Sequence, residues 1–293
     1  MFEREFLVYV NGEFMPKGEA KVSVFDHGFL YGDGIFEGIR AYNGRIFRLT
    51  EHIDRLYESA KTIKLSIPLS KQEMKDVCAE TLRRNKIKDG YLRLVVSRGA
   101  GKLGLDPRNC ERPTIVAIPT EYVVTVANAK PAKAIVASTR RTPSVSLPPT
   151  VKSCNYLNNV LARIEAINAN ADEAIMLDIR GYVSEGAGDN VFIIRRGSLI
   201  TPPLHAGVLE GVTRLVVMEI ARKLGIEVAE KDITIHELYN AEEAFITGTG
   251  GEIQSLIEID GRTVGVGKPG PITQRIVEEF KQEVTRPEAG YPV

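Results

Sequence analysis

Tight turns that contain glycine, placed between short apolar segments, constrain the fold of this chain most. Asn11-Gly12 separates Leu7–Val10 from Glu13–Met15, and an Asn-Gly pair favours the positive φ angles of a two-residue β-hairpin turn. Further hairpins are expected at three later turns: Gly181, Gly197 and Asp260-Gly261. Strands and helices do not alternate in a sustained way, so the pattern predicts an α+β fold and argues against a doubly wound parallel sheet.

Two helices are expected in the first half of the chain. Thr50 is a candidate N-cap for the first, and Ser70 with Glu73 forms the capping-box pattern that begins the second. Apolar residues at helical spacing should face the core, and they are Ile53, Leu56, Ala60 and Ile63 in the first helix and Met74, Val77, Cys78 and Leu82 in the second.

Three more helices are expected in the second half. The first follows Lys152, and its inward face should be apolar, with Leu157, Val160, Leu161 and Ile164. The second runs from Val212 to Leu224 and ends at Gly225, which suits a left-handed cap. The last helix carries Ile272, Ile276, Val277 and Phe280.

A length of 293 residues is enough for two domains with their own cores. Residues 121–128 give no strong helix or strand signal, and Pro131 follows them. We therefore predict a small α+β domain at 1–120, an interdomain linker at 121–128, and a larger domain at 129–293.

Composition excludes several classes of protein. Lys and Arg total 38, as do Asp and Glu, so no net field favours nucleic acid or a membrane surface. The three cysteines form no C-x-x-C pair, and the four histidines show no metal-ligand spacing. No apolar run is long enough to span a bilayer. We expect a cytoplasmic enzyme or binding protein that needs no metal.

One glycine motif is a false signal for nucleotide binding. Residues 99–104 read GAGKLG after an apparent strand, as a dinucleotide-binding loop would. Such a loop must open a helix, yet Asp106-Pro107 follows at once. A glycine loop beside a pocket is the better interpretation.

Three features between Lys152 and Arg214 point instead to pyridoxal phosphate. Lys152 lies at the junction before a helix, where burial would make its amine a nucleophile and base. Glu185 lies beside a glycine-rich turn and can approach a ring nitrogen. Gly211-Val212-Thr213 opens a helix whose free amides can hold a phosphate.

Each of these residues also has an ordinary structural explanation. Lys152 taken alone is most simply a solvated surface lysine. Glu185 can hydrogen-bond its own loop amides, and Asp189 is a rival carboxylate. Thr213 can be a simple helix cap, and 247–251 can furnish a second set of amides and hydroxyls.

Taken together, the motifs resemble the pyridoxal-phosphate enzymes of fold type IV, the class IV aminotransferases. Residues 185–192 (EGAGDNVF), Leu199 with Thr201, and 209–214 (LEGVTR) fit the long signature of that family. The likeness continues in 31–44, 47–56, 91–99, 246–253 and 267–273. Nearly the whole chain is similar to branched-chain amino-acid aminotransferases.

The resemblance implies a fold and a role for particular residues. It implies a smaller N-terminal α/β domain and a larger pseudo-barrel domain. Lys152 would hold the cofactor covalently, Glu185 would pair with the ring nitrogen, Tyr156 would hydrogen-bond the phenolic oxygen, and Leu209 would pack on the ring. The phosphate would be bound by Arg48, Val212, Thr213 and Thr249. The substrate pocket would be lined by Tyr31, Phe36, Gly38, Tyr91 and Arg93, with the amides near Thr249 and Gly250 meeting the α-carboxylate.

The resemblance also implies a reaction and an assembly. It implies transamination of L-leucine, L-isoleucine and L-valine with 2-oxoglutarate by a ping-pong mechanism, in a homodimer or higher homo-oligomer. The same fold serves D-amino-acid aminotransferases and aminodeoxychorismate lyases, which remain the alternatives. The D-specific relatives typically use an Arg-x-His pair, whereas this chain has Arg108-Asn109-Cys110. A cysteine thiol carries no positive charge, so the branched-chain interpretation is favoured.

Overall fold

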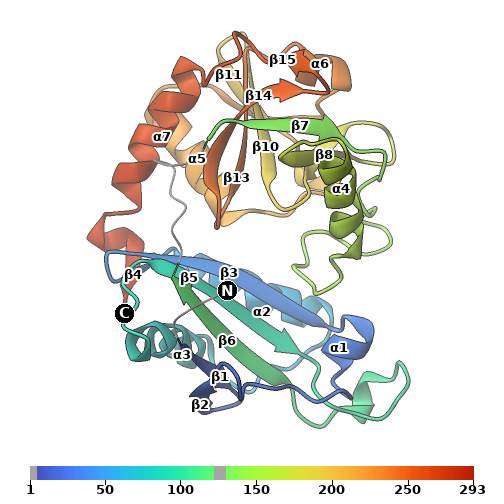
Figure 1. Cartoon of the computed structure of the whole chain (residues 1–293), viewed down its shortest axis with the longest axis vertical. Helices are drawn as coiled ribbons and strands as arrows, with labels where there is room; N and C mark the ends of the chain where they lie inside the picture. Colours follow the sequence, from blue (N-terminus) through green and yellow to red (C-terminus); the bar gives the residue numbers. More distant parts are fainter. Residues whose placement is uncertain (1–4, 122–129) are drawn as a thin grey trace. The chain divides into compact units, whose positions relative to one another are not determined.

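The computed structural model describes residues 5–121 and 130–293, which fall into two compact units (Figure 1). Unit 1 comprises residues 1–123, 151–155 and 284–293, and unit 2 comprises 124–150 and 156–283. The expected linker falls mainly on 122–129, outside the described residues. The division at 121–128 therefore stays a prediction.

Unit 1 is built on a seven-stranded antiparallel sheet with the strand order β16-β4-β3-β5-β6-β1-β2. Its strands are β1 Leu7–Val10, β2 Glu13–Pro16, β3 Gly34–Tyr42, β4 Arg45–Phe47, β5 Gly90–Ser97, β6 Thr114–Glu121 and β16 Gly290–Pro292. Its helices are α1 His27–Tyr31, α2 Leu49–Thr62 and α3 Lys71–Arg84. The first hairpin is confirmed, because Asn11 and Gly12 have φ angles of 50° and 104° between β1 and β2.

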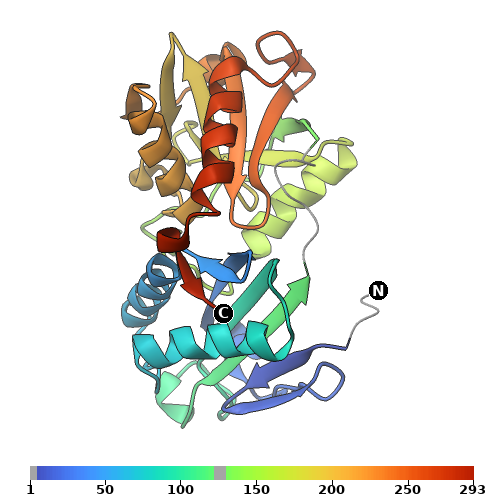
Figure 2. The same cartoon turned by 90° about the vertical axis from the view of Figure 1, so that its left-hand side faces the viewer.

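The core of unit 1 lies between one face of this sheet and helices α2 and α3, and Figure 2 shows α3 in front of the strands. The capping box of Ser70 and Glu73 is confirmed. The N-cap predicted for α2 is wrong: Thr50 lies inside the helix, and Arg48 occupies the cap in the left-handed region with φ 49°. The chain passes from β4 into α2 with only this residue between them, so the cap position is fixed before Thr50 is reached.

Unit 2 is built on a nine-stranded mixed sheet with the order β12-β11-β10-β13-β14-β7-β8-β9, and β15 pairs with β14 off this path. Its strands are β7 Ala132–Val136, β8 Glu173–Leu177, β9 Val183–Gly186, β10 Asn190–Arg195, β11 Ser198–Thr201, β12 Val228–Glu230, β13 Glu243–Gly248, β14 Glu252–Ile259 and β15 Arg262–Thr263. Its helices are α4 Leu157–Asn168, α5 Val212–Lys223, α6 Ile235–Tyr239 and α7 Pro271–Glu283.

The sheet of unit 2 curls, because β9 at one end of the order lies against β10 near its middle. The expected turns at Gly181, Gly197 and Asp260-Gly261 are present, and each glycine has a positive φ angle. Gly225 follows α5 with φ 72°, as expected. Two local β–α–β crossovers occur, through α4 and α5, but most strand neighbours are antiparallel.

Helix α4 is turned the opposite way from the prediction. Its apolar residues are exposed, by 70% at Leu157 and 47% at Leu161, and Val160 and Ile164 are exposed as well. Its buried residues are Asn159, Ala162 and Ala166. The two alanines pack in a small cluster against the sheet, where their small size permits close approach.

Candidate active site

In unit 1, the backbone of Lys152 is hydrogen-bonded to both β3 and α2. Its carbonyl accepts from the Phe36 amide at 2.9 Å, and its own amide donates to Ser59 Oγ of α2 at 3.2 Å. Its Nζ lies 4.7 Å from the centre of the Phe36 ring. The lysine is half-buried, so the expectation that it belongs to an element junction and not to open surface agrees with its position.

Four of the five expected pocket residues share one face of the unit 1 sheet. Gly38 pairs with Arg93 across β3 and β5, and paired residues project to the same side. The Arg93 guanidinium lies 4.6 Å from the Phe36 ring centre and 5.6 Å from that of Tyr91. A Cβ at Gly38 would overlap the Tyr91 hydroxyl, so glycine makes room for that group.

Tyr31 comes from α1 and not from the strands of this sheet face. It ends α1, and its hydroxyl accepts from the Gly104 amide at 2.9 Å. The loop 99–104 therefore packs beside α1 and opens no helix, as expected.

A second arginine of this face was missed by the sequence analysis. Arg40 is 3% exposed, pairs with Tyr91 across the two strands, and lies 4.9 Å from the Tyr42 ring. Strand alternation from Phe36 and Gly38 could have found it, since every second residue of a strand faces the same side.

On the opposite face of β3 from Phe36 and Gly38, a network of charged side chains joins this strand to α2. Glu37 accepts two hydrogen bonds from Arg55 at 2.7 Å and one from His52 at 2.8 Å. Burial alone would raise the pKa of Glu37, but Arg55 and His52 together lower it to about 2. Burial lowers the pKa of His52, against the opposing effect of Glu37, so the imidazole is neutral.

Arg48, the expected phosphate ligand of unit 1, stands at the start of α2. Its guanidinium pairs with Glu51 at 3.0 Å and lies 5.9 Å from the Phe47 ring. Its left-handed backbone conformation ties its position to the β4–α2 junction.

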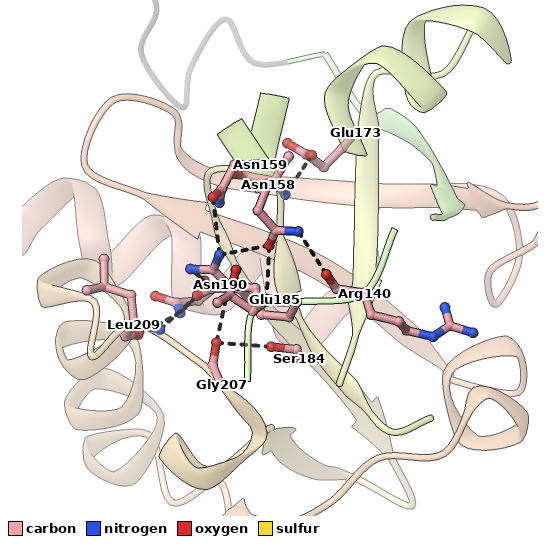
Figure 3. Close-up of polar contacts among 12 residues, drawn as sticks. Arg140, Asn158, Asn159, Glu173, Ser184, Glu185, Asn190, Gly207 and Leu209 are labelled. Atoms are coloured by element: carbon pink, nitrogen blue, oxygen red, sulfur yellow. Dashed lines mark hydrogen bonds and ion pairs between the residues drawn. The ribbon is translucent and has the colours of Figure 1, made fainter. Parts of the chain in front are cut away.

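In unit 2, Glu185 is 5% exposed and is held at both carboxylate oxygens (Figure 3). Oε1 lies 2.8 Å from Nη2 of Arg141. Oε2 accepts from the Leu209 amide at 2.9 Å and from Asn190 at 3.3 Å. The structure thus groups Glu185 with Leu209, and Arg141 is a further residue that the sequence analysis missed.

The rival carboxylate, Asp189, lies elsewhere. Its Oδ1 occupies the place that a Cβ on Gly248 would take. Gly248 follows Thr247, so the two positions face opposite sides of β13. Thr247 pairs with Asn190 across β13 and β10, and the Asn190 side chain hydrogen-bonds Glu185. Glu185 therefore lies on the Thr247 side of β13, and Asp189 lies on the opposite side.

The start of α5 has the features of an anion site. Gly211 is the N-cap and provides no side-chain hydrogen bond, and the next residues, Val212 and Thr213, are buried. A Cβ on Gly211 would overlap Asn190 Oδ1, so glycine is required for this close approach. Buried Thr247 Oγ1 has no hydrogen-bond partner among the described residues. An uncapped helix start and an unsatisfied hydroxyl on the Asn190 face both suit a phosphate.

The other expected cofactor residues of unit 2 lie at loop positions. Tyr156 is the half-buried N-cap of α4. Thr249 and Gly250 lie in the turn between β13 and β14. In the described part of the chain, no cluster of three or more acidic, histidine or cysteine side chains could hold a metal ion. Among the same residues, none of the helices combines the length and the hydropathy that a membrane span requires.

The chain is similar to known aminotransferases over most of its length. The family profile described as "Amino-transferase class IV" matches residues 34–259. A protein of Methanocaldococcus jannaschii, provisionally named a branched-chain-amino-acid aminotransferase, is 53% identical over 95% of this chain and 96% of its own length. The Pseudomonas aeruginosa branched-chain-amino-acid aminotransferase is 36% identical over 96% and 93%.

A solved structure shows the same fold. The branched-chain amino acid aminotransferase of Thermobaculum terrenum, in its pyridoxal-phosphate form, has a TM-score of 0.88 and 32% identity, covering 96% of this chain and 94% of that one. The expected fold, with a smaller α/β part and a larger curled sheet, is therefore confirmed.

Proposed function

Because the chain belongs to the class IV aminotransferases, we propose that it transfers the amino group of L-leucine, L-isoleucine and L-valine to 2-oxoglutarate with pyridoxal phosphate. The observation that carries the cofactor assignment is the unit 2 group: a buried carboxylate beside an uncapped helix start and an unsatisfied hydroxyl. The Thermobaculum terrenum relative was solved with this cofactor.

Each polar end of the cofactor has proposed ligands. Arg48, the Val212 and Thr213 amides and Thr249 would bind the phosphate, Tyr156 the phenolic oxygen, and Glu185 the protonated ring nitrogen. Leu209 would pack on the ring. Bound pyridoxal phosphate would supply an electron-withdrawing ring that stabilises negative charge at the substrate α-carbon.

The protein side chains would manage the protons. Lys152 would anchor the cofactor through Nζ and, once released, carry the proton from the substrate α-carbon. Glu185 would hold the ring nitrogen in its protonated state. One ketoacid would leave before the second binds, which is ping-pong kinetics.

The proposed substrate pocket combines apolar walls with a cation. Phe36 and Tyr91 offer aromatic surface, Gly38 leaves space beside the Tyr91 hydroxyl, and Tyr31 would complete the wall. Arg93 lies over both rings and would receive the distal carboxylate of glutamate or 2-oxoglutarate. The α-carboxylate would meet the amides near Thr249 and Gly250.

We also propose a homodimer or higher homo-oligomer in the cytoplasm. The exposed apolar face of α4 supports self-association, because a contiguous apolar patch on a small enzyme commonly marks an interface. Free Cys78, Cys110 and Cys154 suit a reducing compartment. Light scattering should show that Leu161→Glu shifts the assembly towards monomer, whereas Arg222→Glu, at an exposed position of α5, does not.

The cofactor assignment is tested by borohydride trapping. Purified protein should be yellow, its spectrum should change when L-leucine is added, and peptide mapping should place the reduced adduct on Lys152. Lys152→Ala should lose the adduct and the activity. An adduct on another lysine would refute the assignment, and a bound cofactor that ignores amino donors would indicate a carrier protein.

A further inference from the structure

Arg141 contacts Glu185 but has no role in the proposed mechanism. Its side chain is 7% exposed, as buried as the carboxylate that it contacts. The 2.8 Å contact joins Nη2 to Glu185 Oε1, on the opposite oxygen from the Leu209 amide and Asn190.

The guanidinium is itself fixed on its other nitrogens. Nη1 donates to Asn159 Oδ1 at 3.1 Å and to Asn158 Oδ1 at 3.4 Å, and Nε donates to the Gly207 carbonyl at 3.3 Å. Figure 3 shows Asn158 and Asn159, both from α4, and Gly207 gathered around Glu185. These partners leave the guanidinium a single orientation.

The two asparagines are held in turn. Asn159 donates to the Ala187 carbonyl at 2.7 Å, next to the loop that follows Glu185. Asn158 donates to the Arg140 carbonyl at 2.9 Å and accepts from the Thr142 amide at 3.1 Å. Asn158 and Asn159 of α4, whose inward position the apolar pattern did not predict, therefore hold Arg141 in place.

We propose that Arg141 is a positioning residue that fixes the orientation of Glu185 and keeps it charged, so that the proton between this carboxylate and the cofactor ring nitrogen stays on the ring. The inference rests on the proposed function. Its physical basis is that a buried carboxylate without a cation favours the neutral form, and would then compete with the ring for that proton. A guanidinium partner removes the competition.

Three variants separate the effect of the Arg141 charge from the effect of its shape and from the effect of a change at a neighbouring residue. Arg141→Met removes the charge at similar size, and Arg141→Lys keeps the charge but loses the planar fork. Arg140→Met is the matched control, since this exposed neighbour bonds only the Ala137 carbonyl through its side chain among the contacts found in the described residues. Each variant is loaded with pyridoxal phosphate labelled with ¹⁵N at the ring nitrogen.

The ¹⁵N shift is the decisive readout, because a merely structural role would not move it. We expect a protonated ring nitrogen in wild type, Arg140→Met and Arg141→Lys, and a shift towards the neutral ring in Arg141→Met. The kcat of Arg141→Met for L-leucine should fall roughly 10²-fold with little change in KM, and Arg141→Lys should restore part of it.

A second measurement needs no cofactor. In the apo protein, Arg141→Met should lower the denaturation midpoint at pH 7, and this loss should shrink as the pH falls and Glu185 takes up a proton. Arg141→Met combined with Glu185→Gln should recover most of the midpoint, because it leaves no buried charge unpaired. If the single variant does not fold, this double variant and Arg141→Lys still give the comparison.

The outcomes distinguish the two proposals. A wild-type protein that binds no cofactor at Lys152 would overturn the proposed function. A wild type with a protonated ring, together with an Arg141→Met variant that matches Arg140→Met in ¹⁵N shift, kcat and apo midpoint, would leave that function standing and overturn the role of Arg141.

Discussion

At the scale of single residues, the two candidate carboxylates make a sharp comparison. Glu185 is buried against Arg141 and the Leu209 amide, whereas Asp189 lies at Gly248. Glu185→Gln should retain cofactor but lower kcat roughly 10²-fold, because an amide no longer favours the protonated ring. Asp189→Asn should stay near wild type. Steady-state kinetics with cofactor content measured in parallel decide this, and the reverse ranking would show that Asp189 is the partner of the ring nitrogen.

Arg93 should divide the two substrate classes. Its guanidinium lies over Phe36 and Tyr91, so it can meet a carboxylate without withdrawing the apolar walls from leucine. A hydrogen bond to a charged group contributes about 1.5–3 kcal/mol, so Arg93→Ala should lower kcat/KM for L-glutamate roughly 10- to 100-fold. The value for L-leucine should change far less. Arg83→Ala, on the exposed face of α3, is the control; equal losses with both donors would refute the divided role.

The acid stability of unit 1 should depend on Glu37. Its pKa is lowered to about 2 from an ordinary value near 4.5, so the folded state binds fewer protons than the unfolded state between these values. The stabilisation is therefore complete above about pH 5 and is lost as the pH falls towards 2. Burial of neutral His52 acts in the same direction, since its pKa is also lowered.

Glu37→Gln leaves the Arg55 charge without its carboxylate and should destabilise the protein by about 3–5 kcal/mol at neutral pH. The loss of stability on acidification should become shallower. Denaturant titrations from pH 3 to 8 measure both effects, with Glu80→Gln, on the surface of α3, as the control that costs less than about 1 kcal/mol. An unchanged acid slope in Glu37→Gln would contradict the assignment.

At the scale of elements, the sequence predicted the features that depend only on interactions between residues close together in the chain. The hairpin at Asn11-Gly12 and the capping box at Ser70 follow from φ preferences and from hydrogen bonds within a few residues, and both are present. The predicted orientation of α4 was wrong, because apolar spacing identifies an apolar face but does not show whether that face packs against the chain's own core.

In the candidate site as well, the sequence indicated features within one short segment but not contacts between distant residues. Glu185 and the start of α5 belong to one continuous signature, so the sequence alone was enough to propose them. Arg141 lies 44 residues before Glu185 and has no spacing that links the two, so only the fold could join them. Arg48 was expected as a ligand, but its place as the left-handed cap of α2 depends on the β4–α2 junction.

The start of α5 gives a prediction at this scale. A Cβ on Gly211 would overlap Asn190 Oδ1, and Asn190 bonds both Glu185 and the Leu209 carbonyl. Gly211→Ala should therefore weaken pyridoxal phosphate binding by roughly 10-fold or more, about 1.4 kcal/mol. Gly188→Ala is the matched control, since a Cβ there meets nothing within 4 Å. Absorbance titration of the apo variants measures the Kd, and equal affinities would contradict the close-approach argument.

At the scale of the whole molecule, similarity covers almost the full chain, so the open question is which substrates of the fold this protein prefers. The class IV fold also serves enzymes of D-amino acids. We propose that their Arg-x-His carboxylate site corresponds here to Arg108 and Cys110, and that it is incomplete without the histidine. Arg108 is already paired with Asp106 at 2.6 Å, and burial raises the pKa of the Cys110 thiol, which keeps it uncharged.

We therefore expect L-leucine to be turned over roughly 10²-fold or more faster than D-alanine or D-glutamate, because a trap without a free cation cannot orient the D-carboxylate. Coupled assays with 2-oxoglutarate and each donor, at matched concentrations, give the ratio. Omitting the acceptor tests the remaining alternative, since a lyase would release pyruvate from aminodeoxychorismate without any ketoacid, and none should form. Cys110→Ser should leave the ratio unchanged, because the thiol is not expected to contact substrate. A faster rate with either D-donor would show that the preference had been assigned to the wrong enantiomer and that Cys110 was the wrong residue on which to base it.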